Sequence, residues 1–141
     1  MLARFAFLVL TMLLPVQQPL RAEDPVAAAQ AVVSRQIAAF LADDEAAAFA
    51  DAAPNMRNGI ADSARFLDMA RARYRPVYGV RSYAFGRSKL VGGGELVLQE
   101  VMVADREGRD WTAIFEVRLM DDGVNKINGI RLLRNSSSQG I

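Results

Sequence analysis

The sequence has 141 residues, with 17 lysines and arginines against 16 aspartates and glutamates, and it lacks both histidine and cysteine. This length predicts a single domain. The net charge of +1 gives no electrostatic signature of nucleic-acid binding, so we expect no nucleic-acid partner. Disulfides, thiolate zinc sites, cysteine nucleophiles and Ser-His-Asp triads are excluded by composition, and we expect neither a cofactor nor a metal.

The N-terminal segment has the pattern of a secretory signal peptide. Arg4 precedes an apolar run from Phe5 to Val16, and Leu20-Arg21-Ala22 offers a cleavage site. The run is shorter than the about 20 apolar residues that a membrane span needs. We therefore predict a signal peptide over residues 1–22, export to a bacterial periplasm or out of the cell, and no stable membrane anchor after cleavage.

The first part of the mature chain predicts helices. Apolar residues recur every three or four positions from Pro25 to Leu41, and Asp24 is in place to cap that helix. Acidic residues at 43–45 favour the start of a second, short helix over Glu45 to Ala52, because negative charge complements a helix N-terminus. Asp43 or Asp44 would be its cap.

A third helix is predicted between Asp62, its cap, and Pro76, its end. Three arginines, at positions 71, 73 and 75, gather near its C-terminal end, where cations complement the helix dipole. The same basic group could bind an anion.

The pattern changes from helical to extended after Val80. Four runs are separated by short connections that contain glycine, which permit only antiparallel neighbours. The runs are Arg81 to Val91, Glu95 to Asp105, Asp110 to Met120 and Val124 to Leu133. The sequence thus predicts one α+β domain over residues 23–134, with three helices packed on a curved four-stranded antiparallel sheet, and a flexible tail over residues 135–141.

The second and third runs predict which face of the sheet the helices cover. If Asp105 pairs with Asp110 across the turn, one face is nearly all apolar and should be the covered one. It carries Leu96, Leu98, Glu100, Met102 and Ala104 opposite Leu119, Val117, Phe115, Ala113 and Trp111.

Glu100 is then the single charge on the covered face. An ionised carboxylate is costly there unless it is paired or solvated, so we expect a cavity, a partner or a raised pKa. The alternatives are a bulge that turns Glu100 outward and a buried hydrogen bond to a tyrosine or an arginine.

The opposite face is predicted to be only half polar. Val97, Val101, Val103 and Ile114 form an apolar patch on it, and such patches often mark interfaces. We predict a homodimer that packs through this outer face. Coverage by a loop or by the C-terminal tail is the alternative.

Helices followed by a curved antiparallel meander, with one helix in its concavity, are similar to the nuclear-transport-factor-2-like (cystatin-like) cone. Particular stretches resemble the bacterial domain-of-unknown-function 4864 family. These are Gln36 to Phe40 with Asp43-Asp44, Arg65 to Met69, Tyr74 to Tyr78, and Asp122-Gly123 with Ile127-Asn128-Gly129. The resemblance spans about residues 27–133, and it implies the fold and export but no chemistry, because that family has no established activity.

The wider superfamily contains isomerases, hydrolases and cyclases besides binding modules, and the resemblance implies a site inside the cone. The inward candidates for a ligand pocket are Glu100, Tyr74, Tyr78, Trp111 and Phe115. No residue is assigned a catalytic role, although Glu100 is a candidate general base beside hydroxyl donors.

Three functions follow from these expectations. The first is an exported, non-catalytic module that binds a small apolar molecule or dimerises. The alternative is a periplasmic isomerase- or hydrolase-like enzyme that uses a buried Glu100. The third is an interaction module that presents the basic end of the third helix to a partner. A cavity of about 300 Å³ or more that contains Glu100 would favour the ligand or the enzyme.

Overall fold

The computed structural model describes residues 24–135, so the predicted signal peptide and almost all of the predicted tail lie outside the described residues. Five helices precede four strands. The helices are α1 (Pro25–Leu41), α2 (Glu45–Ala50), α3 (Pro54–Arg57), α4 (Ser63–Arg73) and α5 (Arg75–Tyr78). The strands are β1 (Ser82–Val91), β2 (Leu96–Ala104), β3 (Asp110–Leu119) and β4 (Asn125–Arg134).

The predicted helix caps are confirmed. The Asp24 side chain accepts a hydrogen bond from the Val26 amide at 3.0 Å, and Asp62 accepts one from the Ala64 amide at 2.8 Å. Asp44, rather than Asp43, caps α2. The short helices α3 and α5 were not predicted, and each carries a proline in its first turn, where the missing amide hydrogen costs nothing. No helix within the described range is long and apolar enough to cross a membrane.

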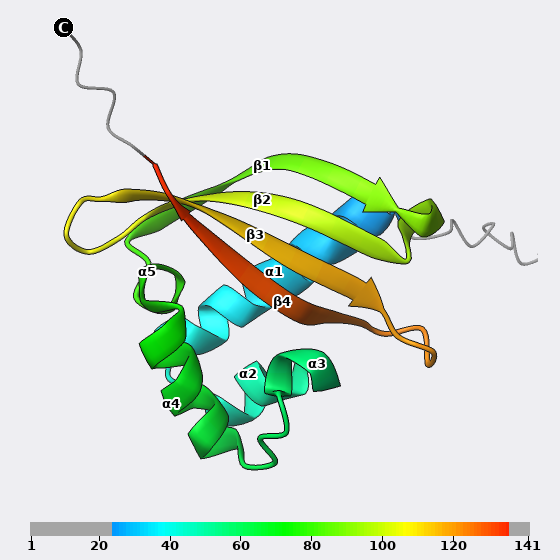
Figure 1. The fold of residues 1–141 in the computed structure, drawn as a ribbon, viewed down its shortest axis with the longest axis horizontal. Helices are drawn as coiled ribbons and strands as arrows, with labels where there is room; N and C mark the ends of the chain where they lie inside the picture. Colours follow the sequence, from blue (N-terminus) through cyan, green and yellow to red (C-terminus); the bar gives the residue numbers. More distant parts are fainter. Residues whose placement is uncertain (1–23, 136–141) are drawn as a thin grey trace, which may run out of the picture.

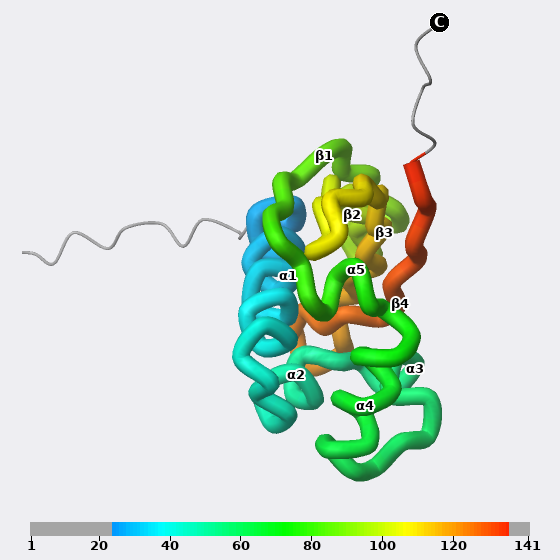
Figure 2. Tube along the Cα trace, turned by 90° about the vertical axis from the view of Figure 1, so that its left-hand side faces the viewer, coloured from blue at the N-terminus to red at the C-terminus, as the bar shows by residue number. Residues whose placement is uncertain are grey.

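The strands form one antiparallel sheet in the order β1-β2-β3-β4, as the short connections predict. The helices lie on one face of this sheet, and α1 runs across that face and contacts all four strands (Figure 1). The tube view shows α1 beside the strands and the α2–α4 region below them (Figure 2). The fold is therefore α+β, with N-terminal helices packed on a four-stranded antiparallel sheet.

The predicted pairing of β2 with β3 is wrong by one residue. Ala104, not Asp105, lies opposite Asp110, and Val101 lies opposite Ala113. The cause is the turn between the strands, where Gly108 has a φ of 75° and its amide bonds the Asp105 carbonyl. A turn followed by a left-handed glycine places two residues opposite one, which is a bulge, and this shifts the register by one position.

The shift exchanges the two faces of β2, because neighbouring side chains along a strand point to opposite faces. Val97, Val101 and Val103, predicted on the outer face, are buried in the core. Ala113, Phe115 and Val117 are buried as predicted. Glu100, predicted to point toward the helices, lies on the outer face instead.

Glu100 and Gln99 hold a bulge in β1 from its two sides. The register of β1 shifts between Phe85 and Ser88, and the Glu100 carboxylate accepts hydrogen bonds from the Arg87 amide and guanidinium at 3.2–3.3 Å. These bonds lower the pKa of Glu100 rather than raise it. On the inner side, the fully buried Gln99 donates to the Glu100 carbonyl at 2.9 Å and accepts from the Ser88 hydroxyl.

The core contains a second buried glutamine, Gln36 of α1. Its side chain is fully buried like that of Gln99, but neither its amide nitrogen nor its oxygen has a hydrogen-bond partner among the described residues. A buried polar group without a partner loses its hydration and gains nothing in return. Gln36 therefore lowers the free energy of unfolding of the domain.

The two glutamines predict opposite responses to replacement by methionine, which has a similar length. Gln36→Met should raise the free energy of unfolding by roughly 1–3 kcal/mol, because it removes unpaired polar atoms. Gln99→Met should lower the free energy of unfolding, because it leaves the bulge carbonyls and Ser88 without a partner. Urea denaturation of both variants measures the effect, and a less stable Gln36→Met protein would contradict the prediction.

The homodimer through the outer face stays a prediction, but its residues change. The outer face now carries Leu98, Met102, Ile114 and Leu133, and no described helix covers it. Size exclusion with light scattering should give twice the mass of one chain. Met102→Lys should give a monomer, whereas Leu119→Lys, an exposed leucine on the other side of the sheet, should not. A monomeric wild-type chain at micromolar concentration would end this prediction.

Candidate functional site

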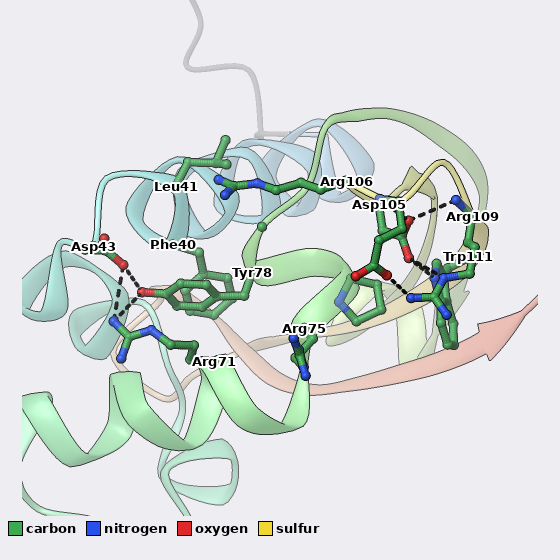
Figure 3. Close-up of a pocket in the computed structure, with 13 residues that line it drawn as sticks. Phe40, Leu41, Asp43, Arg71, Arg75, Tyr78, Asp105, Arg106, Arg109 and Trp111 are labelled. Atoms are coloured by element: carbon green, nitrogen blue, oxygen red, sulfur yellow. Dashed lines mark hydrogen bonds and ion pairs between the residues drawn. The ribbon is translucent and has the colours of Figure 1, made fainter.

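A cleft of about 580 Å³ opens where three parts of the chain meet. The C-terminal end of α1 forms one wall, the α4–α5 region forms the second, and the turn between β2 and β3 forms the third. Figure 3 shows an acid–arginine group at each end of the cleft, Asp43 with Arg71 and Asp105 with Arg109. The cleft is thus an aromatic and charged opening at the edge of the core.

An aromatic pair forms the first end of the cleft. The rings of Phe40 and Tyr78 stack with centroids 5.2 Å apart and an angle of 29° between their planes. The Arg71 guanidinium lies 5.1 Å from the centroid of the Tyr78 ring. The Tyr78 hydroxyl donates to the Asp43 carboxylate, and Arg71 donates to that carboxylate at 3.3 Å and to the Tyr78 oxygen at 3.2 Å. Side chains from α1, α4 and α5 are tied together in this way.

The backbone at Asp43 explains why its side chain reaches Tyr78. The Asp44 amide donates to the Ala39 carbonyl at 2.9 Å and the Asp43 amide donates to the Phe40 carbonyl at 3.2 Å, which is the Schellman arrangement at the end of a helix. Asp43 occupies the left-handed position, with a φ of 50°, where glycine is usual. An aspartate at this position carries a backbone cost, which its contacts with Tyr78 and Arg71 offset.

Charge and burial set the protonation of this group. Hydrogen bonds from Tyr78 and then Arg71 lower the pKa of Asp43. Burial, followed by the hydrogen bond to Asp43, raises the pKa of the Tyr78 hydroxyl. At neutral pH the aspartate is therefore ionised, with one carboxylate oxygen bonded to Tyr78 and Arg71, and the tyrosine keeps its proton.

Asp105 organises the other end of the cleft. Its buried carboxylate accepts hydrogen bonds from the Glu107 and Arg109 amides at 2.9 Å and from the Trp111 indole at 3.0 Å. The Arg109 guanidinium lies 3.3 Å from the same carboxylate and also pairs with Glu107. Burial alone would raise the pKa of Asp105, but the Arg109 amide, the Trp111 indole and the Arg109 charge outweigh it and lower that pKa.

Two further arginines lie between these ends. Arg75 is the first residue of α5, and Arg106 comes from the β2–β3 turn. Both are exposed, and neither has a side-chain hydrogen bond or ion pair with any residue in the range 24–135. The chain from 24 to 135 contains no group of acidic residues placed to hold a metal ion.

A comparison with known protein families identifies the family of this domain. A model of a domain of unknown function, DUF4864, matches residues 22–140. The chain belongs to the DUF4864 family. The resemblance read from the sequence is thereby confirmed, over a slightly longer stretch than expected. No curated protein matches the chain significantly.

The DUF4864 domain brings together only part of the predicted pocket. Tyr78 and Trp111 line the cleft, from its two ends. Tyr74 and Phe115 are buried in the core and do not line it. Glu100 lies on the far face of the sheet beside Arg87, so the expectation of a buried Glu100 in a cavity is wrong.

Several cleft residues were not predicted as site residues. Asp43 was interpreted mainly as a helix cap, and Asp105 as a strand end. Both roles are local, whereas their partners Tyr78 and Trp111 are supplied by other parts of the fold. Arg71 and Arg75 did carry a signal, since the arginines at the end of the third predicted helix were noted as a group that could bind an anion.

Asp105 predicts an acid-dependent loss of stability. Its pKa is lowered in the folded state, so its contribution is complete above the ordinary aspartate pKa of about 3.9 and is lost as the pH falls through the lowered value. Asp105→Asn should therefore melt below the wild-type chain at pH 7, and the two melting temperatures should converge between pH 5 and pH 2. The fluorescence of Trp111, the only tryptophan, reports the melts.

A control variant separates this effect from the change of net charge. Asp121→Asn removes the same charge from an exposed turn, and it should leave the neutral-pH melting temperature close to that of the wild type. A difference between Asp105→Asn and the wild type that stays constant down to pH 2 would show that the ionised carboxylate is not what stabilises the turn.

Proposed function

We propose that this DUF4864 domain is a non-catalytic binding module that holds a small molecule in the cleft between α1, α5 and the β2–β3 turn. The observation that carries the proposal is the state of the three acidic residues that line the cleft. Asp43, Asp105 and Glu107 are each bound by donors of the protein itself. A cleft in which each carboxylate already has a donor of the protein as its partner is better suited to recognition than to proton abstraction.

The size and the walls of the cleft support this function. Small-molecule sites occupy about 300–1,000 Å³ and are lined by apolar and aromatic side chains with a few polar groups. The cleft, at about 580 Å³, lies within that range. Phe40, Tyr78 and Trp111 supply aromatic surface, and Leu41, which is 48 % exposed at the rim, adds aliphatic surface.

The enzyme alternative loses its main support. It required Glu100 in an apolar interior with a raised pKa, whereas Glu100 pairs with Arg87 outside the core. The interaction-module alternative keeps some support, because Arg71 and Arg75 of the basic group line the cleft. The proposal assigns that group to a small ligand.

The proposal also includes a nuclear-transport-factor-2-like cone as the fold and export as the location of the protein. The meander is curved and α1 lies along its covered face, as in the nuclear-transport-factor-2-like cone (Figure 1). The cleft lies at one end of this covered face, which is where a cone opens. The signal-peptide pattern of residues 1–22 supports export to the periplasm or beyond.

Native mass spectrometry of the protein purified from an exporting host tests the proposal. A fraction of the wild-type chain should carry a non-covalent adduct that is lost on denaturation. Tyr78→Ala removes the stacked wall and should reduce the adduct fraction at least roughly tenfold, since a buried aromatic contact contributes a few kcal/mol. Its matched control, Tyr83→Ala, changes a tyrosine on β1 outside the cleft and should retain the adduct.

Two outcomes would contradict the proposed binding site. An adduct that survives Tyr78→Ala but disappears in Tyr83→Ala would place the ligand elsewhere on the domain. A bare wild-type chain, together with a fragment screen that shifts no NMR signal of Tyr78 or Trp111, would reject a binding role for the cleft.

A further inference from the structure

The charges around the cleft do not balance. Four arginines line it, at positions 71, 75, 106 and 109, against the three acids Asp43, Asp105 and Glu107. Arg71 and Arg109 are held by those acids. The three lining acids are therefore paired with two of the four arginines, and Arg71 also pairs with Asp68 outside the lining, so the positive charge left without an ion pair is that of the other two arginines.

The excess is localised at Arg75 and Arg106. Neither guanidinium has a hydrogen bond or an ion pair with another side chain in the described part of the domain. Figure 3 shows Arg106 and Arg75 reaching the cleft from different directions. They come from the β2–β3 turn and from α5, so two segments far apart in the sequence bring two free guanidinium groups to one opening.

The contacts of the Arg106 side chain show that it extends over the cleft. Its Nε lies 3.5 Å from where a Cβ would stand on Gly79, so the side chain extends across the start of the chain segment that leads into β1. Its field also reaches the Asp43 end. The hydrogen bonds of Tyr78 and Arg71 are the main causes of the lowered pKa of Asp43, and the charge of Arg106 adds to them. Arg106 therefore acts on the cleft rather than on the solvent beyond the turn.

The guanidinium group determines which anions fit. Its planar fork of donors matches the oxygens of a carboxylate or a phosphate, and its charge is permanent. The aromatic surfaces of Tyr78 and Trp111 flank these donors, and they favour a flat apolar group beside the anion. An exposed arginine on an open surface lacks such walls and binds anions weakly.

We propose that the ligand of the cleft is a small organic anion, whose carboxylate or phosphate group pairs with Arg75 or Arg106 while a flat apolar group lies against the aromatic side chain on that side of the cleft, Tyr78 or Trp111. This inference rests on the proposed function and adds the chemical class of the ligand. The acids at the two ends are already paired within the protein, Asp43 with Arg71 and Asp105 with Arg109, which reduces their repulsion of such a ligand.

Calorimetric titration with three probes of nearly equal shape tests the inference. The probes are 2-naphthoate, 2-naphthyl phosphate and the neutral 2-naphthamide. At least one of the two anions should bind at least roughly tenfold more tightly than the amide, as expected for charge-assisted hydrogen bonds. Its affinity should fall as sodium chloride is raised, because salt screens the exposed arginines. Preference for one anion over the other identifies the group that the arginines recognise.

Variants assign the effect to the two arginines. The double variant Arg75→Gln with Arg106→Gln should lower the affinity for the bound anion at least roughly tenfold and leave the weaker binding of 2-naphthamide unchanged. Arg73→Gln is the matched control, since Arg73 is an exposed arginine that does not line the cleft. It should bind the anion like the wild type. Circular dichroism checks that all three chains are folded.

Two results would overturn the inference. Equal affinity for the amide and the anions, with NMR shifts at the Trp111 indole, would mean that the cleft binds small molecules without selecting charge, so the proposed function would stand without it. No binding of either anion at millimolar concentration would also reject it, and the native mass measurement would then decide the proposed function on its own.

Discussion

The turn between β2 and β3 is the constraint on which the rest of the structure depends. The buried Asp105 carboxylate gathers two amides of the turn and the Trp111 indole, and Gly108 takes up the left-handed position that completes the bulge. One residue more or fewer in this turn would move every side chain of β2 to the other face of the sheet. The identity of the core and the outward position of Glu100 both follow from it.

The same turn builds one wall of the cleft. Arg106 and Arg109 are turn residues, and Trp111 is aligned by its bond to Asp105. The opposite wall depends on another backbone irregularity, the left-handed Asp43 at the end of α1, which directs its carboxylate to Tyr78 and Arg71. Residues in uncommon backbone conformations tend to lie near functional sites. In this domain they hold the acids in place, and the two arginines between them have no side-chain partner among residues 24–135.

Local patterns were enough to predict the helices α1, α2 and α4 and all four strands, because caps, periodicity and glycine turns act over a few residues. The choice of face on β2 was a different matter. Both of its faces read as apolar with one polar residue, Gln99 on one and Glu100 on the other. The amide of Gln99 satisfies the carbonyls of the β1 bulge from inside the core, whereas the charge of Glu100 is better placed beside Arg87 in water.

The sequence by itself determined the order of the elements and the antiparallel meander, since these depend on short-range periodicity and on connections too short to allow another topology. The resemblance of particular stretches indicated the family, which the family model confirms. Only the tertiary structure decided which acids of the cleft are paired and which arginines have no side-chain partner in the described part of the chain. Asp43 meets Tyr78 across 35 positions of the chain, and Arg75 and Arg106 meet at one cleft although neither lies near the other in sequence. Contacts of that range arise from packing of the helices against the sheet, and no local pattern encodes them.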